Sequence, residues 1–263
     1  MPDRLRLPDR LRLYAEIIRS GYLLYRAELP LKVELATNLP RALLQGIFYA
    51  VLGRLLGDAG FALAGVVAFS GCSNAIIGVA DVPMSDQWEG TYFRLQAGVV
   101  SPGTVHLLRS IPYALSGTVT SVIVLCVDAP LLGLAGHVIP LLAALPLYCL
   151  MVASATMFGL SVAVLAAGAG QDILFGNLAS YAVLALAGVV VPLSARLSWL
   201  GPVSAVLPLR HGLTAVRAFT AGGPWAAEAG WELAVCIAWA AVALACSVLK
   251  DRHARGALRA AAL

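Results

Sequence analysis

Residues 59–80 read AGFALAGVVAFSGCSNAIIGVA, a run of 22 positions without a charged side chain. About 20 apolar residues in a helix are enough to cross the hydrocarbon core of a bilayer. Further uncharged stretches run over 110–127, 129–171 (His137 apart), 173–195 and 233–249. The chain is 60% hydrophobic and only 12% charged, about half of the ~25% that is usual in globular domains. We therefore predict an all-α integral membrane protein.

The uncharged stretches predict six transmembrane helices. These lie at about residues 35–56, 59–81, 106–127, 138–167, 173–193 and 231–249. The first is the least regular, because Arg41 and Arg54 flank a short uncharged centre and have to snorkel toward the interfaces. Lysine and arginine gather in both terminal segments, as they do in cytoplasmic segments of membrane proteins. An even number of spans then predicts a multi-pass protein with both termini in the cytoplasm.

The domain organisation follows from these spans. Residues 1–32 are expected to form a cytoplasmic tail and an amphipathic helix lying in the membrane interface, residues 33–250 the six-span domain, and residues 251–263 a second cytoplasmic tail. An apolar face that recurs every three or four residues predicts the interface helix. This face consists of Leu11, Tyr14, Ile18, Tyr22, Tyr25 and Leu29.

The connection at residues 82–105 has the pattern of a short cytoplasmic helix, at about 83–103. Ser85 or Asp86 is a candidate N-cap, and Glu89 stands three residues after Asp86, as in a capping box. The apolar face of this helix would be formed by Trp88, Tyr92 and Leu95. Such a face suits either docking of a partner protein or packing on lipid headgroups, and the pattern does not separate the two.

The connection at residues 194–225 is too apolar for a free loop, and glycine and proline break it too often for a span. Residues 203–219 predict one or two short re-entrant or interfacial helices on the external side. Irregular backbone at membrane depth requires cover by protein or a water-filled cavity. Both an outer gate and an inert plug fit this pattern.

Motifs for chemistry on this chain are missing from the sequence. It contains no G-x-x-x-x-G-K-[ST] phosphate loop, no HExxH and no GxSxG, so we expect no catalytic residues and no metal site. Nor do basic and aromatic residues alternate as nucleic-acid binding requires. The aspartates Asp58, Asp81, Asp128 and Asp172 stand at predicted span ends, which disfavours a carrier driven by an ion gradient.

Three features together resemble one family. The first is the amphipathic helix ahead of six spans. The second is Glu89-Gly90-Thr91, followed by Leu95 and by Ser101-Pro102. The third is GVVVPL at 188–193, then LPLRHG at 207–212 and Arg217. Over nearly its whole length the chain resembles the ABC-2 type permease subunits of bacterial ABC exporters, which have the fold called type V.

The resemblance implies a division of labour between chains. A separate ABC ATPase subunit would bind ATP and Mg²⁺, so no cofactor is expected on this chain. A second permease chain, identical or similar, would complete the path through the bacterial inner (plasma) membrane. The implied coupling residues are Asp86, Trp88, Glu89, Gly90, Thr91, Tyr92 and Arg94, and the implied external gate consists of Pro192, Pro208, Arg210, His211 and Arg217.

Within this family the chain looks closer to drug- and antibiotic-resistance exporters, because it lacks the basic and aromatic N-terminal run of polysaccharide exporters. The implied function is ATP-driven efflux of an amphipathic small molecule, lipid or lipopeptide. The alternatives are an ion-gradient-driven secondary transporter and a polysaccharide-exporting ABC-2 permease.

Overall fold

The computed structural model describes residues 7–56, 58–167, 172–191 and 199–261, and over these ranges it contains helices and no strand. The helices are α1 (Leu7–Glu28), α2 (Leu31–Val33), α3 (Leu39–Leu55), α4 (Ala59–Gly78), α5 (Asp81–Trp88), α6 (Tyr92–Ala97), α7 (Pro102–Arg109), α8 (Ile111–Leu131), α9 (Val138–Ala143), α10 (Leu145–Ala166), α11 (Asp172–Leu186), α12 (Gly201–Val206), α13 (Arg210–Thr220) and α14 (Ala226–Ala261). A π-helical turn, Glu34–Asn38, joins α2 to α3, and a 3₁₀ turn, Ala135–His137, precedes α9. The predicted all-α fold is confirmed.

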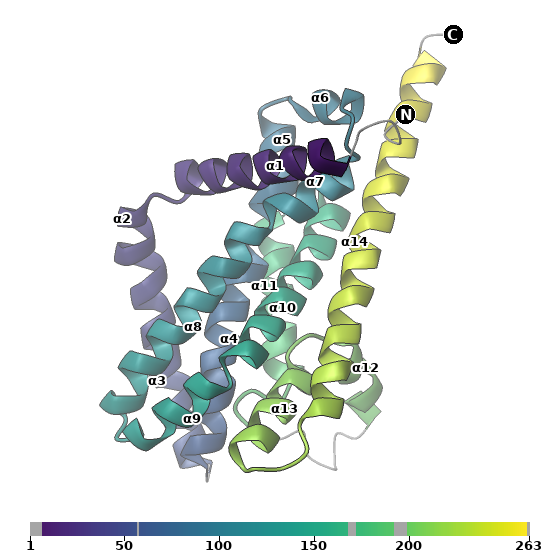
Figure 1. Ribbon diagram of the computed structural model, residues 1–263. Helices are drawn as coiled ribbons and strands as arrows, with labels where there is room; N and C mark the ends of the chain where they lie inside the picture. Colours follow the sequence, from purple (N-terminus) through teal and green to yellow (C-terminus); the bar gives the residue numbers. More distant parts are fainter. Residues whose placement is uncertain (1–6, 57, 168–171, 192–198, 262–263) are drawn as a thin grey trace.

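Helix α1 lies crosswise over one end of the bundle, while α12 and α13 lie at the other end (Figure 1). It packs on α7 and α8. Gly21 is buried because α1 rests on the backbone of Arg109, where an added Cβ would approach Cα to 2.9 Å. Tyr25 is 3% exposed and meets the ring of Tyr113 edge to face, with the centroids 4.9 Å apart. The predicted N-terminal helix is confirmed, although Leu11 and Tyr22 of its apolar face remain exposed.

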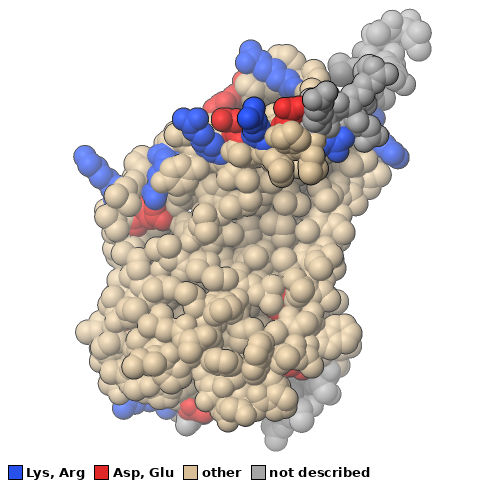
Figure 2. Space-filling model, in the orientation of Figure 1, with Lys and Arg blue, Asp and Glu red and all other residues tan. Residues whose placement is uncertain are grey.

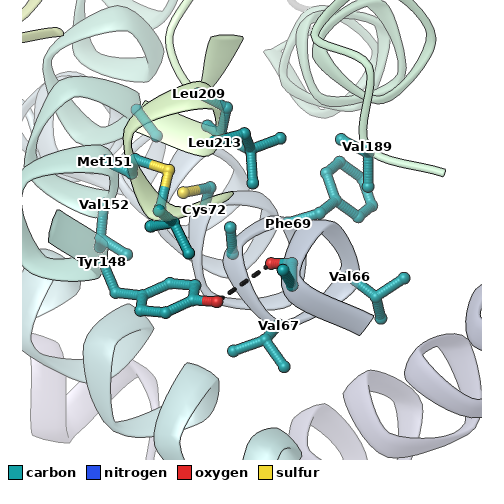
Figure 3. Packing of buried hydrophobic residues seen from close by; sticks show 14 of the residues in the cluster. Val66, Val67, Phe69, Cys72, Tyr148, Met151, Val152, Val189, Leu209 and Leu213 are labelled. Atoms are coloured by element: carbon teal, nitrogen blue, oxygen red, sulfur yellow. Dashed lines mark hydrogen bonds between the residues drawn. The ribbon is translucent and has the colours of Figure 1, made fainter. Parts of the chain in front are cut away.

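Helix α4 is the centre of the bundle and packs against α3, α8, α10 and α11. Val66, Phe69 and Cys72 on α4 are at most 1% exposed. Figure 3 shows Cys72 beside Met151 of α10 and the ring of Phe69 beside Val189. The hydroxyl of Tyr148 donates a hydrogen bond to the carbonyl of Ala64 at 3.2 Å. A phenol buried among apolar side chains thus finds a backbone acceptor, as such groups require.

Glycines bring helix backbones into direct contact in this bundle. A Cβ added at Gly71 of α4 would lie 2.3 Å from the carbonyl oxygen of Gly117 on α8. At Gly65 it would overlap the backbone of Val189 beyond α11, and at Gly159 it would come within 2.8 Å of Cα of Ile76. Small residues allow this close approach between membrane helices.

Four helical stretches of the described chain are long and apolar enough to cross a membrane. They are Ala59–Trp88, Pro102–Leu131, Leu145–Ala166 and Ala226–Arg252, and they correspond to four of the predicted spans. The other two predicted spans are the shorter helices α3 and α11, so the count of six stays a prediction. The start of α1 and the far part of α14 lie at the same end of the molecule (Figure 1), as an even number of crossings requires.

Charged side chains gather at the two ends of the molecule, and a broad uncharged belt separates them on the face that Figure 2 shows. Leu44, Phe48, Leu115 and Leu178 are more than 60% exposed although they lie on α3, α8 and α11. In water such surfaces would be costly, whereas in a bilayer they face hydrocarbon. The belt is what an integral membrane protein requires.

Two predicted helices are interrupted. The span expected at 138–167 breaks at Ala144, between α9 and α10. Pro146 explains this break, because it has no N–H to donate and its ring clashes with the carbonyl four residues earlier. The single helix expected at 83–103 is wrong, since the segment forms α5, α6 and α7.

Candidate functional site

The α5–α7 segment at the α1 end is held by a buried ion pair. Asp86 is 6% exposed, and Nη1 of Arg109 donates to its two carboxylate oxygens at 3.0 and 2.9 Å. Nε2 of His106, also buried, lies 3.5 Å from the same carboxylate. The predicted capping role of Asp86 is wrong, because Asp86 lies inside α5 and its side chain turns inward to join α5 to α7. Its predicted part in contacting an ATPase stays a prediction.

A sharp turn follows Asp86 and separates α5 from α6. Gly90 has φ +64°, a conformation that glycine adopts without strain. The backbone N–H of Thr91 then donates to the carbonyl of Asp86 at 2.9 Å. This glycine turn is why the predicted capping box and single helix do not form. Ser101 caps the start of α7 by accepting a hydrogen bond from the N–H of Thr104 at 3.3 Å.

The turn presents most of the predicted coupling residues at the surface. Trp88 is 72% exposed, and Phe93 is 62% exposed with Arg94 5.7 Å above its ring centroid. Glu89, Gly90 and Arg94 are also exposed, while Thr91 and Tyr92 are half-buried. We call residues 88–94 the α5–α6 turn. It combines exposed aromatic rings with charges of both signs, which suits a protein contact.

The predicted gate residues lie at the opposite end, except Pro192, which falls outside the described residues. Pro208 is buried just before α13. Nη1 of Arg210 donates to the carbonyl of Gly201 at 2.9 Å and so ties α13 to α12. Nδ1 of His211 lies 2.7 Å from a carboxylate oxygen of Glu228 on α14. One or two short helices were expected over 203–219, and the structure has two in this region, α12 and α13.

Arg217 joins three segments at this end. Its Nη2 donates to the carbonyls of Phe61, Gly188 and Val189 at 3.1, 3.1 and 3.2 Å. Its guanidinium also lies 3.3 Å from the centroid of the Phe61 ring. One side chain of α13 therefore binds backbone carbonyls just beyond α11 and near the start of α4. The predicted orientation puts Arg217 on the external side, and these contacts give its positive charge a structural role.

Glu232 is a residue that the sequence reasoning missed. It is 0% exposed and accepts hydrogen bonds from the backbone N–H groups of Leu209 at 3.1 Å and Gly212 at 2.9 Å. Leu209 has φ 79°, a strained conformation for a residue with a side chain. Glu232 thus holds the start of α13 against α14. A carboxylate at the edge of an apolar run, following the prolines and glycines of 201–224, was the available signal.

A second missed residue, Glu34, collects hydrogen bonds beneath α1. It accepts from the hydroxyl of Tyr25 at 2.9 Å, the hydroxyl of Ser116 at 2.7 Å and Nη1 of Arg26 at 2.7 Å. Burial raises the pKa of Glu34, but the hydrogen bonds from these three donors outweigh it and hold this pKa below its ordinary value. Glu34 stands just ahead of the first predicted span. An acidic residue there is typical of a span boundary, so the sequence offered no reason to expect a buried cluster of hydrogen bonds.

No group of three or more histidine, cysteine or acidic side chains close enough to hold a metal ion occurs in the part of the chain that the structure describes. Asp128 is the one aspartate of α8 and is 0% exposed. Neither of its carboxylate oxygens has a hydrogen-bond partner among the described residues, and Gly46 of α3 packs directly on it. It lies in the last turn of α8, as expected from its place at a predicted span end.

A family model described as ABC-2 type transporter matches residues 23–220. The match begins within α1 and ends with α13, so it covers both ends of the bundle described above. No curated protein matches the chain.

Proposed function

The chain belongs to the ABC-2 type transporter family, and from this premise we propose that it is the permease subunit of an ATP-driven exporter. The family is the membrane component of ABC transporters, and it implies an ABC ATPase partner and a lipid bilayer as surroundings. Our proposal adds the direction, which is outward, and a bacterial inner membrane with both termini in the cytoplasm. It also adds a second permease chain, identical or similar, that completes the path.

The observation that carries this proposal is the α5–α6 turn. It lies at the α1 end with Trp88 and Phe93 exposed beyond the apolar belt. Exposed aromatic residues at an otherwise charged surface favour a protein partner. The buried pair of Asp86 and Arg109 connects this turn to α7, so a push on the turn is carried into the helices that follow.

Co-purification with an ATPase tests this assignment. An ATPase with a phosphate loop, encoded beside this chain, is co-expressed and retained through a tag on the permease. Trp88→Ala is expected to reduce the amount of retained ATPase several-fold and to uncouple ATP hydrolysis from transport. Glu89→Ala is expected to reduce ATPase retention and coupling more strongly still. Trp199→Ala is the matched control, because Trp199 is 71% exposed at the α12 end. Equal retention by the Trp88 and Trp199 variants would defeat the proposed docking role.

We further propose an amphipathic cargo, in the manner of drug- and antibiotic-resistance exporters. The support is the apolar surface that faces the bilayer, which gives such molecules a route from the membrane. Cells that express the permease with its ATPase are expected to survive higher doses of amphipathic antibiotics than cells with a hydrolysis-deficient ATPase. Equal survival would contradict the resistance assignment, and transport by an ion gradient without ATP would contradict the permease assignment itself.

A further inference from the structure

A cavity of about 270 Å³ lies at the α1 end, between α1, α3, α4, α5 and α8. Sites for drug-sized ligands usually have ~300–1,000 Å³, so this volume suits a headgroup better than a whole amphiphile. The apolar part of its lining includes Leu29, Ile77 and Trp88.

Most of the neutral polar groups in the lining already have hydrogen-bond partners. Tyr25 and Ser116 donate to Glu34, and Nδ2 of Asn74 donates to Oγ of Ser116 at 3.2 Å. The hydroxyl of Tyr113 donates to Glu28 at 3.1 Å. These groups therefore form a fixed polar wall and leave little hydrogen-bonding capacity for a ligand.

Two charged groups of the lining remain without partners. Arg41 on α3 and Asp81 on α5 both line the cavity, and neither makes a hydrogen bond or an ion pair with any residue that the structure describes. Glu28, a second carboxylate, stands close enough to Asp81 to interact with it electrostatically. The cavity thus has a cationic and an anionic part. Arg41 is exposed, whereas Asp81 is half-buried, and a half-buried unpaired charge is unfavourable until an opposite charge meets it.

We propose that this cavity binds the headgroup of a zwitterionic amphiphile from the adjacent membrane leaflet. The phosphate or carboxylate of the headgroup pairs with the guanidinium of Arg41, and its ammonium group pairs with the carboxylate of Asp81. The apolar chain extends from the cavity into the adjacent bilayer leaflet. This inference rests on the proposed export of an amphipathic cargo and names the class of that cargo.

Binding of two fluorescent short-chain lipids by the full chain in detergent tests the proposal. Phosphatidylethanolamine carries both charges, whereas phosphatidylglycerol carries the negative charge alone. The unaltered chain is expected to bind phosphatidylethanolamine about tenfold more tightly, the effect of one partly exposed charge pair. Arg41→Gln is expected to weaken both lipids about tenfold, and Asp81→Asn to weaken phosphatidylethanolamine alone by a similar factor.

Matched controls separate the cavity from the general charge of the protein. Arg54→Gln removes a second arginine of α3, and Asp9→Asn removes an exposed aspartate of α1; neither residue lines the cavity. Both variants should bind like the unaltered chain. Arg41→Lys and Asp81→Glu keep the charges and should bind within about threefold, which shows that losses in the neutral variants do not come from misfolding.

The proposal is overturned if the two lipids bind equally, if Asp81→Asn weakens both alike, or if Arg54→Gln acts like Arg41→Gln. No ATPase is present in this assay, so its outcome is independent of the co-purification test. Selective binding without a retained ATPase would leave the cavity assigned and the exporter function refuted. ATP-driven transport with no headgroup selectivity would support the exporter function and refute the assignment of the cavity.

Discussion

Neutralising Asp86 is expected to destabilise the α1 end of the protein substantially. Asp86→Asn keeps the shape of the side chain but leaves Arg109 with an unpaired charge. The two side chains are only 8% and 17% exposed, and removal of one partner from a buried pair costs about 3–5 kcal/mol. The residual exposure of Arg109 places the loss at about 3 kcal/mol, the lower end of this range.

This loss can be converted into two measurable quantities. A change of about 3 kcal/mol lowers the folding equilibrium constant about 160-fold, and for a chain of this size it lowers Tm by about 6–12 °C. The shift in Tm is measured by heating the purified protein in detergent and quantifying the remaining folded protein by size-exclusion chromatography. Glu89→Gln is the matched control, because Glu89 is exposed three residues away and should show no measurable shift.

A double-mutant cycle identifies the pair itself as the cause. Arg109→Gln alone should cost about as much as Asp86→Asn, while the double variant should lose about 1–3 kcal/mol less than the sum of the two. The reasoning is refuted if Asp86→Asn leaves Tm unchanged and instead abolishes ATPase retention. Asp86 would then act as a surface contact, as the sequence alone suggested.

Three further outcomes are expected. Arg217→Lys should lower the free energy of unfolding by about 2 kcal/mol. Lysine lacks the planar guanidinium that donates to several carbonyls while it stacks on the Phe61 ring. An unchanged Tm would refute the stabilising role of Arg217. Gly71→Ala should lower the free energy of unfolding by about 1–3 kcal/mol, because the added methyl group overpacks α4 on α8. Gly136→Ala is the control, since an added Cβ there meets nothing within 4 Å and Tm should not change. Equal shifts in Tm for the two variants would contradict this. Since the pKa of Glu34 is lowered in the folded state, its stabilisation is present above the unfolded value and is lost as pH falls through the folded one. The difference in Tm between the unaltered chain and Glu34→Gln should therefore shrink as the pH falls below about 4.5, and a constant difference would count against it.

The sequence predicted the apolar helices well because a long uncharged run has one solution in a bilayer. The run at 59–80 became α4, and the stretch at 231–249 lies inside α14. Prediction failed where a local pattern competed with a tertiary contact. Asp86 and Glu89 have the spacing of a capping box, yet Arg109, 23 residues away, draws Asp86 inward.

The polar residues inside the bundle were harder to foresee. Glu34 and Glu232 both stand at the edge of apolar runs, where a carboxylate normally marks a span end. Their partners come from segments distant in sequence, such as Ser116 at 82 residues from Glu34. The periodicity of apolar residues carries no information on such pairings. The exposure of Trp88 and Arg94 was easier to expect, because it depends only on their lying in a surface turn.

Helix α14 comprises 36 residues, which at 1.5 Å per residue gives a rod of about 54 Å. Near one extremity it carries Glu232, to which the beginning of α13 is bonded, and its other extremity projects past α1 (Figure 1). A stiff rod that tilts displaces both extremities at once. Movement of α14 as a rigid rod would therefore shift α13 at the same time, together with α7 and α10, which pack along it.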